Sequence, residues 1–116
     1  MLDDHRAVLD RLCAADPSTL ANEEAVIALH RNLARLEAVT TRATAAFEAS
    51  GRWQRSGART AAIWVSIRAN LAKAVAKRRV ALGRCLRHLP ATESAWLAGD
   101  INQSHVSALA RARNPV

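Results

Sequence analysis

A seven-residue apolar repeat constrains this chain more than any other feature, because it requires one long helix with one partner face. Apolar or small residues recur at alternating intervals of three and four between about Glu23 and Ala49: Val26, Leu29, Leu33, Leu36, Thr40, Ala43 and Phe47. This spacing places them on one side of a helix that packs against another helix at a shallow angle. Asn22 is expected to cap the N-terminus of this helix, and Gly51 is expected to end it.

The sequence is compatible with two different partners for this apolar seam. One is another helix of the same chain, in a bundle. The other is a second copy of the chain, in a homodimer coiled coil through the Val26–Phe47 seam.

The rest of the chain is also expected to be helical, because no stretch alternates apolar and polar residues as a strand does. A first helix carrying Val8 is expected to be capped by Asp3 or Asp4, and Asp16-Pro17-Ser18 breaks it. A last helix, capped by Asn102, is expected to run until Asn114-Pro115.

Two stretches share the order short helix, turn, second helix. Thr60-x-x-x-Trp64 and Thr92-x-x-x-Trp96 match at an offset of 32 residues, and each threonine is expected to cap a short helix. A break near Ala69-Asn70 then leads into a second, long helix. DNA-binding helix-turn-helix units use this order. We therefore predict an all-α multi-helix bundle with a long N-terminal helix and two helix-turn-helix-like units, forming a single helical domain over residues 1–116.

Composition limits the kind of protein. Half of the residues are apolar, but aromatics make up only 3%, so the expected core is thin and consists of leucine, valine, isoleucine and tryptophan. The two cysteines, Cys13 and Cys85, are far apart, which argues against a disulfide scaffold and fits a reducing compartment. No apolar stretch is long enough to span a bilayer. We expect a soluble, cytoplasmic protein with no membrane partner.

The charge is distributed unevenly along the chain. No acidic residue lies between Glu48 and Glu93, whereas ten basic residues do. The net charge is −3 over residues 1–50 and +10 over residues 51–116. Unneutralised positive charge favours a polyanionic partner, and nucleic acid is the commonest one in a cell. A solvated, arginine-rich face is the alternative explanation.

The basic residues in this gap fall into two groups. Candidate nucleic-acid contacts are a loop group, Arg52, Arg55 and Arg59, and a stripe on the long helix, Lys73, Lys77, Arg84 and Arg87. Leu71, Val75, Leu82, Leu86 and Leu89 are expected on the opposite, apolar face. Arg78 and Arg79 flank that apolar face and are expected at the edge of the core. Trp53 is a candidate for base stacking, whereas Trp64 and Trp96 are expected in the core.

The chain contains no recognisable catalytic constellation. Its four histidines are scattered, and Cys85 with His88 makes at most half of a metal site. There is no glycine-rich phosphate loop and no nucleophile elbow. Carboxylates are almost absent from the second half, which leaves no acid–base pair there. We therefore interpret this chain as non-catalytic by itself, with no metal and no other cofactor.

One resemblance to a known family rests on the run Trp64 … Leu86-x-x-Leu89-Pro90-x-Thr92-x-x-Ala95-x-x-x-Gly99-x-Ile101-x-x-x-His105-Val106. The run resembles the actinobacterial domain of unknown function family 222, also called the 13E12 repeat family. The resemblance covers nearly the whole chain and implies that the chain is the N-terminal part of a larger family domain. It also implies a mobile-element-like origin and a C-terminal HNH endonuclease module, which this chain lacks, so no catalytic residue is carried over.

The chain departs from the family pattern at two cap positions. Similar sequences tend to have serine where this chain has Ala72 and Asn102, and of these two only asparagine can cap a helix. The second helix of the first unit is therefore expected to start at Asn70.

Three hypotheses follow. The first is a non-catalytic helical module that binds or positions DNA for an HNH-endonuclease-associated protein. The alternative is a helical oligomerisation or protein-interaction module whose basic face is merely solvated. The third, a nuclease in its own right, is supported only by the family resemblance.

Overall fold

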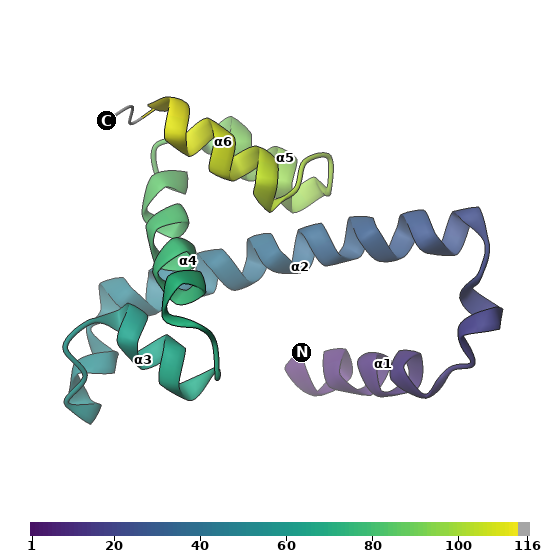
Figure 1. The fold of residues 1–116 in the computed structure, drawn as a ribbon, viewed down its shortest axis with the longest axis horizontal. Helices are drawn as coiled ribbons and strands as arrows, with labels where there is room; N and C mark the ends of the chain where they lie inside the picture. The colour runs from purple at the N-terminus through teal and green to yellow at the C-terminus, as the bar shows by residue number, and fades with distance from the viewer. Residues whose placement is uncertain (114–116) are drawn as a thin grey trace. The chain divides into compact units, whose positions relative to one another are not determined.

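The computed structural model describes residues 1–113, and within them every regular element is a helix (Figure 1). In chain order these are α1 (Leu2–Ala14), η1 (Pro17–Leu20), α2 (Glu23–Ser50), η2 (Arg52–Ser56), α3 (Ala61–Arg68), α4 (Lys73–Leu86), α5 (Pro90–Ala98) and α6 (Gln103–Arg113). The predicted all-α class is confirmed. The chain forms two compact units, Met1–His30 and the residues from Arg31 onward. The expected end of the last helix at Asn114-Pro115 lies outside the described residues.

In the first unit, α1 starts two or three residues earlier than an aspartate cap would allow. Met1 is its N-cap and no side chain caps it, so the prediction that Asp3 or Asp4 does so is wrong. Both carboxylates lie in the first turn, where the helix dipole favours them. The predicted break is confirmed, because the carboxylate of Asp16 accepts the backbone N–H of Ser18 at 3.0 Å. That bond lowers the pKa of Asp16.

Helix α2 begins and ends as the sequence predicts. Asn22 Oδ1 accepts the backbone N–H of Ala25 at 2.8 Å, and Gly51 follows the helix with a left-handed φ of 71°. The expected seam, however, does not face the interior. Leu33 and Leu36 are 56% and 37% exposed, so the interpretation of the seam as an intrachain bundle face is wrong for them. The buried residues of α2 are instead Ala34, Ala38, Thr41 and Ala45.

Small residues allow α2 and α4 to approach closely. A Cβ added at Gly83 of α4 would lie 2.7 Å from Cβ of Ala45 and 3.1 Å from the carbonyl oxygen of Thr41. Larger side chains on this face of α2 would hold α4 away, which is why the alanine face is buried and the leucine face is not. Helix α4 also contacts α3, α5 and α6, so it is the central element of the second unit (Figure 1).

The core lies where α2, α4, α5 and α6 meet. Its members are Ala34, Ala38, Leu82, Leu86, Trp96 and Val106, and the last two are completely buried. The expectation that Trp96 belongs to the core is confirmed. Its indole N–H has no hydrogen-bond partner among the described residues, so packing alone holds the ring there. The predicted burial of Leu82 and Leu86 is also confirmed, but Val75 is exposed.

The two short-helix, turn, helix pairs, α3–α4 and α5–α6, are both present. The first helix of each pair ends in a left-handed residue, Asn70 in one and Gly99 in the other. In each turn a backbone N–H reaches back five residues at 3.0 Å, from Leu71 to Ser66 and from Asp100 to Ala95. This is the Schellman arrangement. Asn70 and Gly99 are 29 residues apart, so the predicted offset of 32 residues, and with it the pairing of Trp64 with Trp96, is wrong.

Two of the predicted caps are confirmed. Thr60 accepts the N–H of Ile63 at 3.1 Å, and Asn102 accepts the N–H of His105 at 3.2 Å. The ring of His105 accepts the N–H of Asn102 in return at 3.1 Å, which makes a reciprocal cap. The predicted cap at Thr92 is wrong, because α5 already begins at Pro90, a residue suited to the first turn.

Helix α4 also starts later than expected. It begins at Lys73, after Ala72, and no side chain caps it. The predicted start at Asn70 is wrong because Asn70 adopts the left-handed conformation that ends α3, with a φ of 55°.

Candidate nucleic-acid interface

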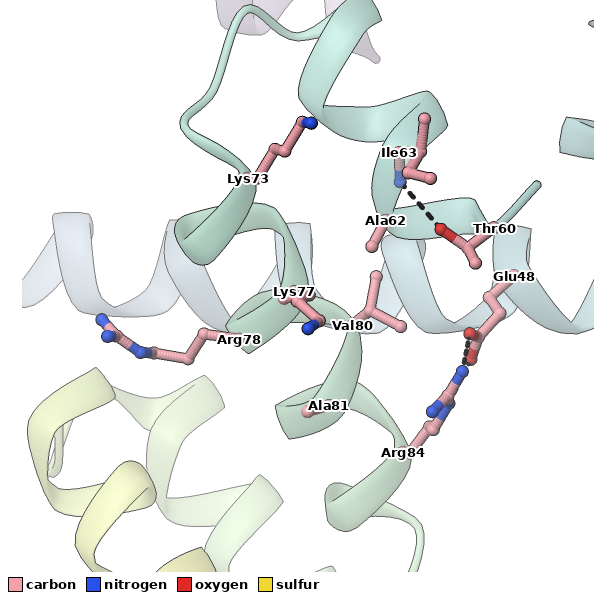
Figure 2. Close-up of a pocket in the computed structure, with 10 residues that line it drawn as sticks. All are labelled: Glu48, Thr60, Ala62, Ile63, Lys73, Lys77, Arg78, Val80, Ala81 and Arg84. Atoms are coloured by element: carbon pink, nitrogen blue, oxygen red, sulfur yellow. Dashed lines mark hydrogen bonds and ion pairs between the residues drawn. The ribbon is translucent and has the colours of Figure 1, made fainter. Parts of the chain in front are cut away.

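An open hollow of about 750 Å³ lies between α3 and α4, next to the C-terminal part of α2 (Figure 2). Its floor is apolar and includes Ala62 and Ile63 from α3 and Val80 and Ala81 from α4. The cap from Thr60 fixes the start of α3 and therefore the position of Ile63. The hollow can accommodate an apolar or flat group.

Basic side chains surround this hollow. Lys73, Lys77, Arg78 and Arg84 line it, all from α4, and all four are exposed. Successive residues on one face of a helix are about 6 Å apart along its axis, so Lys73 and Lys77 form a short row of positive charge. The structure thus brings together three of the residues predicted from sequence, Lys73, Lys77 and Arg84.

Arg84 and Arg87 differ from the two lysines because both are bonded to α2. The guanidinium of Arg84 makes two hydrogen bonds to the carboxylate of Glu48, one of them 2.7 Å long from Nε to Oε1. These bonds raise the pKa of Arg84. The guanidinium of Arg87 donates to the carbonyl oxygen of Ala45 at 3.4 Å. Both residues therefore help to hold α4 on α2, and the charge of Arg84 is already balanced.

Arg78 does not lie at the edge of the core, as the sequence suggested. Its side chain is exposed and extends away from Arg84 in Figure 2. It also lines a second hollow of about 340 Å³ between α4 and α6, together with Arg111. Arg79, in contrast, is half-buried, in agreement with the prediction. Helical periodicity alone could not separate these two residues, because α4 is buried on more than one side.

The loop group lies on and after η2. Arg52, Arg55 and Arg59 are all exposed. Trp53, the candidate for base stacking, is half-buried, and its indole N–H donates to the carbonyl oxygen of Glu48 at 3.0 Å. Its polar edge is therefore occupied by the end of α2, so any stacking by Trp53 would use the exposed part of the ring.

A third hollow, of about 450 Å³, contains an aromatic ring that the sequence assigned to the core. Trp64 lines it with Arg59, Ile67 and Arg68, and it is only half-buried, so the expectation of a core position is wrong in part. The ring centroid of Trp64 lies 4.5 Å from that of Phe47. Arg68 lies 5.8 Å from the Trp64 centroid, within cation–π range. Arg68 was missed as a site residue, although its i, i+4 spacing from Trp64 could have identified it.

Two other features, a metal-binding cluster and a membrane-spanning helix, are absent from residues 1–113. No group of three or more histidine, cysteine, aspartate or glutamate residues in this range could hold a metal ion. None of the helices described is long and apolar enough to cross a membrane.

Comparison with known proteins identifies the family. Searches of curated proteins and of solved structures find no match. The family model described as "Domain of unknown function (DUF222)" matches residues 23–115, which include α2 to α6. The chain therefore belongs to the DUF222 family.

Proposed function

We propose that this chain is a non-catalytic module that binds or positions DNA through the surface formed by η2, α3 and α4. The observation that carries the proposal is a set of exposed basic residues around two adjacent hollows: Arg59, Arg68, Lys73, Lys77 and Arg78. None of these five forms an ion pair with another described residue. Phosphate groups are the partner that such an arrangement of positive charge favours.

The predicted contacts are expected to differ in how much they contribute to DNA affinity. Lys73 and Lys77 have free ammonium groups on the rim of the hollow, so they are expected to contribute most to affinity. Arg84 and Arg87 are expected to contribute less, because their guanidinium groups already bond to α2. Arg52 and Arg55 are exposed on η2 and extend the basic surface.

Fluorescence anisotropy with labelled DNA at several salt concentrations tests the proposal. Lys73→Glu/Lys77→Glu should weaken binding about tenfold or more and reduce the salt dependence by about one unit per lost phosphate contact. The matched control is Arg6→Glu/Arg11→Glu, which changes the net charge equally at exposed positions on α1. Absence of binding at about 50 mM salt, or equal losses in both double variants, would contradict the proposal.

The finer family context is also part of this proposal. In a parent protein of the HNH-associated kind that the resemblance implies, cutting would be done by a separate module, and this chain would present the DNA. We expect the protein to act in the cytoplasm, where DNA is available to it in a bacterial cell. Plasmid nicking by this chain alone, with Mg²⁺ or Mn²⁺, would contradict the non-catalytic assignment.

A second candidate function, self-association, is favoured by the exposed seam of α2. Leu33 and Leu36 retain the predicted spacing and are exposed, whereas Phe47 at the end of the seam already packs on Trp64. A homodimer through the seam would cover these leucines. Sedimentation at several concentrations should then show a dimer that Leu33→Lys disrupts. Ile27→Lys, at an exposed apolar position on another face of α2, should leave the dimer intact.

A further inference from the structure

We propose that this interface binds single-stranded DNA in preference to duplex, with one base against Trp64 and a neighbouring base in the hollow between α3 and α4. The inference rests on the proposed function and specifies its substrate. The hollow between α3 and α4 and the hollow beside Trp64 share Ile63 as a lining residue and therefore adjoin at α3.

The hollow beside Trp64 offers a fixed aromatic surface. Phe47 packs on Trp64 with ring centroids 4.5 Å apart, which holds the indole in place. Ile67, beside it, is 72% exposed, so an apolar surface continues from the ring toward solvent. Arg59 and Arg68 line the same hollow. An aromatic ring with cations around it is the usual platform for an unpaired base and its phosphates.

The hollow between α3 and α4 offers apolar surface below a row of positive charge. Ile63, Val80 and Ala81 supply aliphatic contacts, while Lys73 and Lys77 lie along α4 at its rim (Figure 2). A phosphate placed on the floor would lose its hydration without gaining a hydrogen bond, which is unfavourable. A base on the floor with its phosphate at the lysines satisfies both parts of the site.

A duplex cannot use these hollows in this way. Its bases are stacked on one another, and only their edges are accessible in the grooves. It could contact Lys73, Lys77 and Arg59 through phosphates but would leave the faces of Trp64 and Ile67 uncovered. An unpaired strand exposes the base faces, and stacking on an aromatic residue contributes about 1–3 kcal/mol per base. The single strand therefore makes every contact that the duplex makes, and the base contacts in addition.

Two matched pairs of variants test this inference without disturbing the core. Ile67→Asn makes an exposed residue of the Trp64 hollow polar without changing its charge, and Leu109→Asn makes the same kind of change at an exposed position on α6. Ala81→Leu partly fills the hollow between α3 and α4, whereas Ala74→Leu adds the same atoms at another exposed position of α4. Circular dichroism confirms that all four variants are folded.

Binding is measured for a thymidine oligonucleotide of about 20 residues and a duplex of the same length, which exceed the usual site size. The single strand should bind about tenfold more tightly. Ile67→Asn and Ala81→Leu should each weaken single-strand binding about fivefold or more, within the energy of one stacked base. Duplex binding by these two variants, and all binding by the two control variants, should stay nearly unchanged.

The outcomes separate this inference from the function on which it rests. Duplex binding as tight as single-strand binding, or equal effects of the variants and their controls, would overturn the single-strand preference and leave DNA binding intact. Failure of both oligonucleotides to bind would overturn both proposals. Direct binding of a labelled acidic amphipathic peptide in that case would assign the hollows to a protein partner.

Discussion

The helix pairs α3–α4 and α5–α6 have the same local design but use their tryptophans differently. Both pairs consist of a short helix, a turn with a left-handed residue that the same kind of backbone hydrogen bond closes, and a second helix. Trp96 on α5 is completely buried among residues of α2, α4 and α6. Trp64 on α3 is half-buried, in a hollow with two arginines.

This difference shows that the local design of a helix pair does not decide whether its tryptophan is buried in the core or partly exposed. α5–α6 closes the core against α2 and α4, so its aromatic ring stabilises the domain. α3 packs on α4 and η2 near the end of α2, where Phe47 covers only part of the indole. The rest of that ring lines a hollow with Arg59 and Arg68.

Replacing Trp64 and Trp96 in turn tests the difference between the two helix pairs most strongly. Trp96→Ala should lower the free energy of unfolding by about 3–5 kcal/mol, because it empties a fully buried site in a thin core. Chemical denaturation followed by circular dichroism measures the change. Trp64→Ala, at a half-buried site, should cost clearly less. Equal costs for the two variants would break the comparison.

The contact between α2 and α4 should be the next most sensitive place. Gly83→Ala places a Cβ 2.7 Å from that of Ala45, so the two helices must move apart, and we expect a loss of about 1–3 kcal/mol. The same denaturation measurement applies. Combining Gly83→Ala with Ala45→Gly removes the clashing methyl group and should recover part of the loss. A neutral Gly83→Ala variant would show that the approach of the helices is not limiting.

The second helices of the two pairs, α4 and α6, differ in their N-terminal caps. α6 has the reciprocal cap of Asn102 and His105, whereas α4 follows Ala72 without a side-chain cap. Asn102→Ala should cost about 1 kcal/mol, and Ala72→Asn should gain a somewhat smaller amount. Thermal unfolding of both variants measures these changes. A destabilising Ala72→Asn would indicate that the start of α4 is held by packing alone.

The ion pair between Arg84 and Glu48 should have the smallest effect. Glu48→Gln removes the charge of a pair in which Arg84 is exposed and the Glu48 side chain is only 15% exposed. Because the guanidinium remains in solvent, the change should cost about 0.2–1 kcal/mol, less at high salt. Because the pKa of Arg84 is raised, its contribution is fully present below the ordinary arginine pKa and is lost only in strongly alkaline solution. Unfolding at low and high salt, at neutral pH, measures the effect. No salt dependence of the difference would contradict an electrostatic origin.

Part of the basic surface could be found from the sequence alone. The acid-free run located the basic surface, and Lys73 and Lys77 lie on it as predicted. The sequence could not show that Glu48, at the edge of that run, reaches Arg84 across 36 residues. It also could not separate Arg78 from Arg79, because α4 is buried on several sides. Both distinctions depend on which helices pack around α4.

Local chemistry determined the helical class and several of the helix limits, because the relevant interactions lie within a few residues. Thr60, Asn102, Asn22 and Gly51 act where the sequence predicts, through bonds to their own turn or through a backbone conformation that glycine adopts easily. Only tertiary structure decided which face of α2 is buried. The leucine seam has the stronger apolar pattern, but the alanine face lets Gly83 of α4 approach more closely. The distance at which two helices can pack cannot be read from the positions of hydrophobic residues, and here it decided which face of α2 is buried.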